Sequence, residues 1–275
     1  MQHILVPVDF SKQARCAAKV AAKIAKKTGA DILLLHMLEL PVDIVDAVSG
    51  EQNSAPSSIL FMKKVHECFD QLKNSAFFEG IKITESVQFH KTFDGVIDES
   101  KKQNIDLIVM GSTGANGLKE IVVGSNTEKI VRHSDVPVLV VKEGTTDIDI
   151  KNIVFASNFS QESKSKFQNI IDFANIFQAK LHLLYVNTPH KFNSTQKIRT
   201  TMTNFIAGFS IQEYDRSIYN ETSVEKGILS YSEEVNADLI ALNTHGRSGL
   251  SSFFTPSISQ DLTNHALKPI ITFKI

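Results

Sequence analysis

The sequence predicts an α/β protein made of two copies of one parallel-sheet unit, joined end to end. This prediction rests on the length of the chain, on an internal repeat, and on short apolar runs that alternate with helical periods. With 275 residues, the chain suits two domains of about 140 residues better than a single core. We expect one domain over residues 1–143 and another over 150–275, because the segment between them has no hydrophobic periodicity.

The internal repeat extends over both halves of the chain. Four segments of the first half recur in the second half in the same order. The pairs are 3–11 with 152–160, 30–36 with 179–185, 106–110 with 238–242, and 136–140 with 268–272. Because the order of the segments is preserved, the pattern indicates a duplication, and each copy is expected to fold in the same way.

Short, nearly all-apolar runs in the first half predict strands that are buried on both faces, as in a parallel sheet. They cover residues 4–9, 31–38, 106–110 and 137–142. Ser11 is expected to cap a helix that ends at Gly29, and Ser160 to cap its counterpart. Another helix is expected around residues 59–74. The alternation of strands and helices implies right-handed crossovers and a doubly wound sheet, in which ligands settle beyond the carboxyl ends of the strands.

The last strand of each half is rich in residues that favour strands. These segments are residues 138–141 and 270–273. Two uncovered edges of this kind would invite aggregation, so we expect the two strands to pair with each other. One chain would then form an intramolecular pseudo-dimer, and an association of two chains is left open.

The composition is that of an ordinary globular protein, with 42% hydrophobic and 21% charged residues. A formal net charge of -1 gives no field that would draw the chain to nucleic acid or to a membrane, so neither is expected as a partner. The two cysteines are far apart and provide neither a metal signature nor a disulfide framework. We expect a cytoplasmic protein, because the sequence shows no signal region and no apolar run of about 20 residues.

A glycine-containing loop follows the run 106–110 and is the strongest candidate for a ligand site. Gly111 and Gly114 are expected to let the chain turn sharply and approach a bulky anion. Nine residues after Gly114, Gly124 and Ser125 open a helix whose free N–H groups and positive dipole end suit a phosphate. Alternatively, Ser125 and Glu128 form a capping box that stabilises the helix without any ligand.

This loop, together with Val6-Pro7-Val8-Asp9 and Leu35-His36-Met37, resembles the universal stress protein family over nearly the whole chain. The resemblance implies two tandem Rossmann-like domains, each with a five-stranded parallel sheet of order 3-2-1-4-5, the last strand at the edge, flanked by helices. It also implies that the first domain binds ATP. Asp9 and Met37 would lie near the adenine and the ribose, and the loop would surround the ribose and the phosphates. The nucleotide-binding residues implied are Pro7, Val8, Asp9, Met37, Gly111, Ser112, Gly114, Gly124, Ser125, Asn126 and Thr127.

The second copy keeps the spacing of the loop but not its residues. It reads Asn243-Thr244-His245-Gly246, followed nine residues later by Pro256-Ser257. Asn243 could adopt a left-handed turn, but Pro256 removes a backbone N–H where the first copy has a glycine. Asn158 replaces Asp9 and loses the carboxylate. We therefore expect that this half does not hold ATP in the same way, and an altered site that uses His245 and Arg247 is left open.

The function implied is that of an ATP-binding universal stress protein with a regulatory or stress-response role, with or without Mg²⁺. The sequence favours binding over catalysis, because no lysine follows Gly124 as in a Walker motif and no acidic pair at metal-ligand spacing lies near the loop. Asp9 could reach a Mg²⁺ ion carried by the nucleotide. No catalytic residue and no protein-bound metal is assigned. An interaction module that binds no nucleotide, a weak ATPase or autokinase, and an enzyme acting on adenylates stay open.

Overall fold

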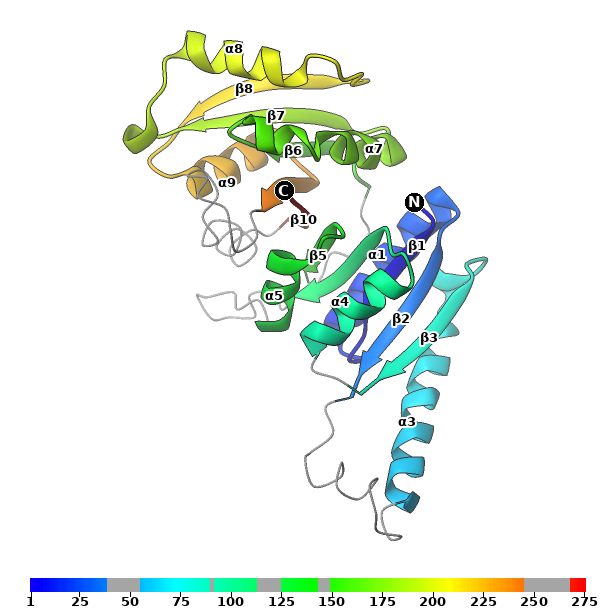
Figure 1. The fold of residues 1–275 in the computed structure, drawn as a ribbon. Coiled ribbons are helices and arrows are strands. Elements are labelled where there is room, and N and C mark those ends of the chain that lie inside the picture. The colour runs from blue at the N-terminus through cyan, green and yellow to red at the C-terminus, as the bar shows by residue number, and fades with distance from the viewer. Residues whose placement is uncertain (39–54, 90–91, 113–124, 143–148, 245–267) are drawn as a thin grey trace.

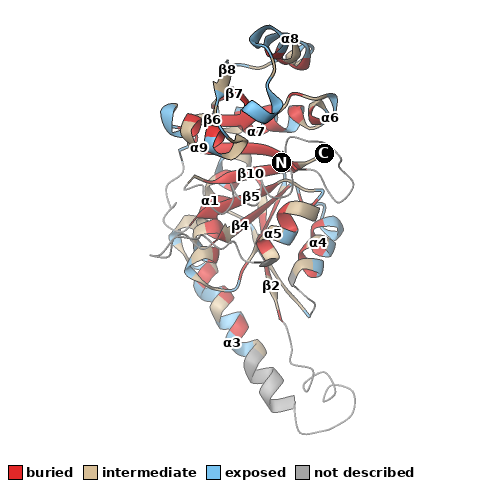
Figure 2. Cartoon of the chain, turned by 90° about the vertical axis from the view of Figure 1, so that its left-hand side faces the viewer, coloured by how far each residue is buried: buried red, intermediate tan, exposed pale blue. Residues whose placement is uncertain are grey.

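The computed structural model describes residues 1–38, 55–89, 92–112, 125–142, 149–244 and 268–275 (Figure 1). In this part of the chain, the strands form one ten-stranded sheet with the order β3-β2-β1-β4-β5-β10-β9-β6-β7-β8. Helices cover both faces of the sheet (Figure 1). Figure 2 shows that the inner strands are buried, whereas the outward faces of the helices are exposed. The two outermost strands are only partly buried or exposed.

The first half contributes the strands β1 to β5 and the helices that flank them. In chain order the elements are β1 (His3–Pro7), α1 (Lys12–Thr28), β2 (Asp31–Met37), α3 (Ala55–Lys73), η1 (Ala76–Phe78), β3 (Ile83–Gln88), α4 (Thr92–Lys102), β4 (Leu107–Ser112), α5 (Ser125–His133) and β5 (Val138–Lys142).

The second half repeats the order of the strands, but its first helix is divided, its 3₁₀ turn precedes the next helix instead of following it, and the segment 245–267 before its last strand lies outside the described residues. Its elements are β6 (Asn152–Ala156), α6 (Gln161–Lys164), α7 (Phe167–Phe177), β7 (Lys180–Asn187), η2 (Pro189–Lys191), α8 (Thr195–Ile206), β8 (Tyr214–Asn220), α9 (Val224–Glu234), β9 (Leu239–Thr244) and β10 (Ile270–Lys274). Here α6 and α7 together correspond to the single helix α1.

The predicted strand order 3-2-1-4-5 is confirmed in both halves, and all pairings within a half are parallel. The strands predicted from apolar runs are present, because those runs are buried on both faces. β3 lies at the outer edge of the sheet and is only partly buried, so its sequence Ile83–Gln88 carries no apolar run that could predict it. The linker around 143–148 lies outside the described residues.

The first helix of each half begins as predicted. The Ser11 hydroxyl accepts a hydrogen bond from the Ala14 amide at 3.2 Å, and Gly29 ends α1 with a left-handed φ of 74°. Ser160 caps α6 in the same way through the Ser163 amide. The inner face of α1 is rich in buried alanines, which let the helix lie close to the sheet.

The two halves are joined through their last strands, and the expected pairing between these strands is present. β5 and β10 run antiparallel, with Leu139 opposite Ile271. Beside this pairing, the Lys274 ammonium binds the Asp135 carboxylate at 2.8 Å and the His133 carbonyl at 3.2 Å. The ion pair with Lys274 lowers the pKa of Asp135. Because Leu139 and Ile271 also belong to one apolar cluster that spans both halves, the sheet and its core are continuous across the junction.

Among the described helices, none combines the length and the apolar character that a membrane crossing requires.

One buried histidine of the second half has a ring nitrogen without a hydrogen-bond partner among the described residues. His182 on β7 is 6% exposed, and its Nε2 lies 3.1 Å from the Asn152 side-chain oxygen. Its Nδ1 is buried and has no hydrogen-bond partner within the described structure. Burial lowers the pKa of His182, with a smaller contribution from Lys180, because a charged ring loses its hydration there.

We expect the free energy of unfolding to fall as the pH drops below about 6.5, the ordinary pKa of histidine in an unfolded chain. At such a pH the unfolded chain binds a proton at His182, whereas the folded protein binds it less readily because the pKa is lowered. Replacing His182→Gln should flatten this dependence in urea-unfolding experiments between neutral and acidic pH. His190→Gln changes an exposed histidine and serves as the control. If the free energy of unfolding of His182→Gln falls with pH as steeply as that of the parent protein, His182 is not the source of the pH dependence.

Candidate functional site

A pocket of about 360 Å³ opens at the carboxyl edge of the first half. It lies where the strand order reverses between β1 and β4, which is the expected ligand position in a doubly wound sheet. The ends of β1, β2 and β4 and the first turns of α1 and α5 contribute its walls. The lining residues are Pro7, Val8, Asp9, Ser11, Gln13, Ala14, Leu35, Met37, Met110, Gly111, Ser112, Asn126 and Thr127.

The structure brings together most of the residues that the sequence singles out. Those that line the pocket are Pro7, Val8, Asp9, Met37, Gly111, Ser112, Asn126 and Thr127. Ser125 begins α5 next to Asn126. Gly114 and Gly124 lie outside the described residues, as do His245, Arg247 and Pro256 of the second half.

Sequence reasoning missed several lining residues that adjoin the predicted ones. They are Ser11, Gln13, Ala14, Leu35 and Met110. Leu35 could have been found, because it lies two residues before Met37 and strand side chains alternate between faces. Gln13 and Ala14 could have been found only from the way in which the first turn of α1 folds back over β4.

The pocket has an apolar side and a polar side. Val8, Leu35 and Met110 are buried apolar residues. Ser112, Asn126 and Thr127 contribute polar side chains to the lining. Of these, Ser112 is 3% exposed and Thr127 is 6% exposed. A pocket with an apolar wall and a few convergent polar groups is typical of sites for organic ligands that also carry polar substituents.

The turn between β1 and α1 is held by Asp9 and by a strained Phe10. The Asp9 Oδ1 accepts a hydrogen bond from the Ser11 amide at 2.9 Å. Phe10 has a left-handed φ of 61°, which costs on the order of 1–3 kcal/mol for a bulky residue. Its ring packs against His36 and Phe69, with ring centres 4.8 and 5.2 Å away, and this packing offsets the strain. The His36 Nδ1 in turn lies 2.7 Å from the Val8 carbonyl oxygen.

The same turn recurs in the second half with Asn158 in place of Asp9. Phe159 has a left-handed φ of 56°, and the Asn158 Oδ1 accepts from the Ser160 amide at 3.0 Å. The substitution therefore keeps the hydrogen bond that shapes the turn and removes only the negative charge. The carboxylate is lost as expected, but the turn is kept because an amide oxygen accepts there as a carboxylate does.

Gly111 has a different role from the one expected of it. It lies inside β4 and not in a sharp turn. A Cβ atom at this position would lie 2.5 Å from the carbonyl carbon of Gln13 and would overlap its oxygen. The glycine is needed because the first turn of α1 passes directly over the end of β4.

Asn243 occupies the corresponding position in the second half. It lies within β9 and is 1% exposed, so the left-handed turn expected for it is wrong. Its side-chain amide donates to the Ser163 carbonyl at 3.4 Å. The helix above it is interrupted between α6 and α7, whereas α1 is continuous above Gly111. The Asn243 side chain thus lies beside the last turn of α6, just before the helix is interrupted.

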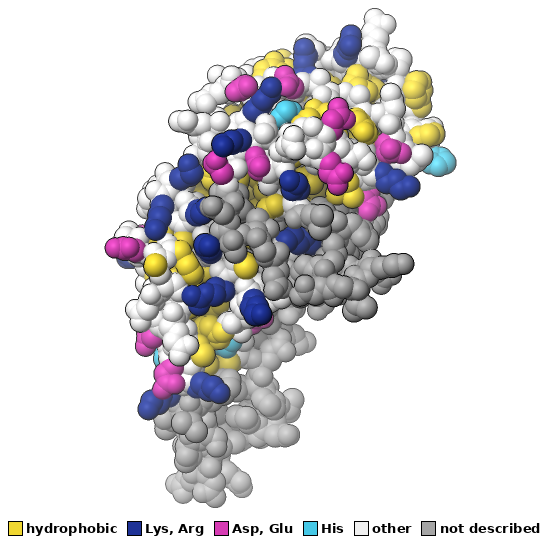
Figure 3. Space-filling view, turned by 180° about the vertical axis from the view of Figure 1, so that it is seen from behind, with side chains coloured by type: hydrophobic (Ala, Val, Ile, Leu, Met, Phe, Trp, Pro, Cys, Tyr) yellow, Lys and Arg dark blue, Asp and Glu magenta, His cyan; other side chains and the backbone are white. Residues whose placement is uncertain are grey.

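Two helix amino-termini at the pocket favour an anion there, while the one charged side chain that lines it in the described part of the chain is the Asp9 carboxylate. α1 contains no acidic residue and carries Lys12, Arg15, Lys19, Lys23, Lys26 and Lys27. In the view from behind, Lys and Arg side chains gather on the first half, which is the lower part of the molecule (Figure 3). The amino-terminal turns of α1 and α5 both line the pocket and present the positive ends of their dipoles to it. Among the described residues, no group of three His, Cys, Asp or Glu side chains could hold a metal ion.

A sequence model of the universal stress protein family matches residues 1–142 and 215–274. The chain belongs to the universal stress protein family. A universal stress protein of Methanocaldococcus jannaschii is 30% identical over 140 residues, which are 51% of this chain and 81% of that protein. One of Bacillus subtilis is 30% identical over 155 residues, or 50% of this chain and 97% of that protein. These relatives therefore match about half of the chain.

The fold likeness to universal stress proteins extends over both halves. The crystal structure of a universal stress protein from Archaeoglobus fulgidus aligns with a TM-score of 0.71 and 22% identity, covering 99% of this chain and 98% of that chain. A structure described as a putative universal stress protein from Pseudomonas aeruginosa aligns with a TM-score of 0.66 and 18% identity, covering 100% and 93%. The tandem arrangement is thus a known architecture of the fold.

The steric role of Gly111 predicts the effect of adding one methyl group. Gly111→Ala should lower the free energy of unfolding by about 1–3 kcal/mol, because α1 or β4 must shift to admit the Cβ atom. Urea unfolding measures the loss. Asn243→Ala is the matched control, since the second half already accommodates a Cβ at that position. If Gly111→Ala is as stable as the parent protein, α1 and β4 do not lie close enough together to exclude a Cβ atom at this position.

Proposed function

We propose that this universal stress protein binds ATP in the pocket of its first half, with or without Mg²⁺, and acts as a nucleotide-dependent regulatory protein of the cell's stress response. One observation carries the proposal: an apolar wall, a carboxylate and a row of hydroxyl and amide groups meet beside two helix amino-termini, at the switch point of the sheet. Eight of the eleven residues that the resemblance implies for nucleotide binding line this pocket.

In this proposal the apolar wall receives the base and the polar side receives the rest of the nucleotide. Val8, Leu35 and Met37 offer the apolar surface for an adenine ring. The exposed Asp9 carboxylate can accept a hydrogen bond from a ribose hydroxyl. Asn126 and Thr127, in the first turn of α5, lie where amide and hydroxyl donors suit phosphate oxygens. Gly114, Gly124 and Ser125 are proposed to complete the phosphate site.

We infer that the second half does not bind ATP in this way. Asn243 fills the space at its strand end, and its Oδ1 and the Thr244 hydroxyl are buried without partners in the described part of the chain. Asn158 also lacks the negative charge of Asp9. The second half would instead complete the sheet as the other member of an intramolecular pseudo-dimer in a cytoplasmic protein.

Binding without fast turnover is the function that the site supports best. Nothing among the pocket residues matches a general base positioned by a second side chain, and no lysine stands where a Walker motif places one. Prolonged incubation with ATP and Mg²⁺, followed by product analysis, separates a binding protein from a weak ATPase or autokinase.

Exchanging the charge in the turn tests the proposal without disturbing the fold. Asp9→Asn should weaken ATP binding about tenfold in calorimetry, because it removes a charge-assisted hydrogen bond while the turn persists, as Asn158 shows. Asn158→Asp is the matched control and should leave ATP affinity unchanged. Equal affinity of the parent protein and Asp9→Asn would remove Asp9 from the site.

The phosphate end is tested by copying the second half into the first. Gly124→Pro removes a backbone donor and fixes φ, so we expect it to weaken ATP binding by roughly tenfold or more. Pro256→Gly should not create a second site, because Asn243 still fills the strand end. If Gly124→Pro binds ATP as tightly as the parent protein does, the backbone at residue 124 does not contact the phosphates.

A further inference from the structure

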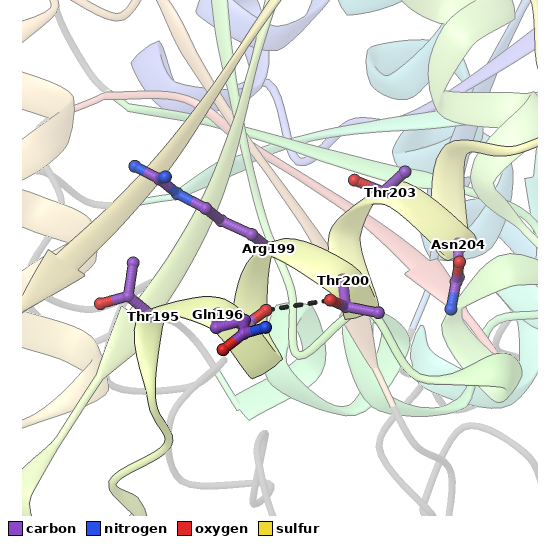
Figure 4. A pocket seen from close by; sticks show the side chains of 6 residues that line it. All are labelled: Thr195, Gln196, Arg199, Thr200, Thr203 and Asn204. Carbon is purple, nitrogen blue, oxygen red and sulfur yellow. Dashed lines mark hydrogen bonds between the residues drawn. The ribbon is translucent and has the colours of Figure 1, made fainter.

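A second cavity lies between α8 and β8, at the outer edge of the second half. Its volume is about 580 Å³. α8 contributes Thr195, Arg199, Met202 and Thr203, and β8 contributes Arg216 and Ile218. We call this cavity the α8–β8 groove. An adjoining hollow on α8 shares three of these residues, and Figure 4 shows Arg199 extending away from the helix there while Thr200 bonds back to the Gln196 carbonyl.

The groove holds two guanidinium groups that no carboxylate neutralises. The Arg216 Nη1 donates to the Thr203 hydroxyl at 2.8 Å, which points Arg216 toward α8. Within the described residues, neither Arg199 nor Arg216 forms an ion pair. The neighbouring Asp215 points to the opposite face of the strand and pairs with Lys180 at 2.7 Å.

The first half provides an internal comparison, because α3 and β3 occupy the same place there. Leu34 and Leu183 are equivalent in the repeat, and they lie opposite Glu85 and Arg216 respectively. Glu85 forms an ion pair with Lys73 of α3 at 2.7 Å, and the His66 Nδ1 lies 3.0 Å from its other carboxylate oxygen. The second half therefore has the opposite charge at this position and has lost the neutralising partners.

The floor and the donors of the groove define the ligand that it suits. The apolar residues of the groove are the partly buried Ile218 and Met202, which is 1% exposed, and Asn220 of β8 also lines it. Planar guanidinium groups match phosphoryl oxygens in pairs of parallel hydrogen bonds. We propose that the α8–β8 groove binds a small phosphomonoester, with its phosphoryl group between Arg199 and Arg216 and its organic part on the apolar floor. The segment 143–214, which includes α8, lies outside the parts of the chain that match the family, whereas Arg216 and Ile218 of β8 lie within them.

Phenyl phosphate is the probe, and calorimetry on the full chain is the measurement. Arg216→Glu restores the residue type of the first half and should weaken the binding at least about tenfold, since it removes charge-assisted hydrogen bonds. Lys197→Glu makes the same change of charge on the exposed side of α8, outside the groove, and should keep most of the affinity. Inorganic phosphate should bind more weakly than phenyl phosphate, because it leaves the floor uncovered.

Three results would overturn the proposal. They are the absence of saturable binding to the parent protein, equal affinity of Arg216→Glu and the parent, and an equal loss in Lys197→Glu and Arg216→Glu. Equal binding of inorganic and phenyl phosphate would overturn the role of the apolar floor. Circular dichroism verifies the fold of each variant, and Arg216→Gln replaces Arg216→Glu if that variant does not fold.

Discussion

The close approach between the first helix and the end of the fourth strand is the constraint on which the site depends. In the first half, Gly111 leaves room for the backbone of Gln13, so α1 continues without interruption and its first turn forms one wall of the pocket. In the second half, Asn243 supplies a side chain at this point, and the helix is divided into α6 and α7. The two halves therefore differ at this position beside the strand end, where the helix is continuous over a glycine and divided beside an asparagine.

The junction between the halves is independent of this constraint. β5 and β10 pair at the centre of the sheet, away from the ends where the pocket opens, and the apolar cluster beneath them runs from one half to the other. Pairing these two strands also removes two free edges, which leaves β3 and β8 as the outer strands of the described sheet. The sheet can thus tolerate divergence of the two strand ends, because its central pairing does not involve them.

Much of the fold could be predicted from the sequence, because its determinants are local. Buried strands appear as apolar runs, and the caps at Ser11 and Gly29 act within one turn of the helix. The steric role of Gly111 could not be predicted, since it depends on Gln13, which is remote in the sequence and becomes a neighbour only in the folded chain. Likewise, the polar edge strand β3 lacks a pattern, and Asn243 is read as a turn residue until its strand is known.

Duplication explains how one chain can carry two different kinds of pocket. At positions where the two halves share the same backbone geometry, a difference between equivalent side chains leaves the local fold unchanged. Asp9 and Asn158 make the same turn but differ in charge, and Glu85 and Arg216 occupy the same register but differ in sign. The negative charge of Asp9 and the positive charge of Arg216 are therefore not required to form the turn or the strand. Arg216 links β8 to α8 through Thr203, and in our proposal its remaining donors serve the ligand of the groove.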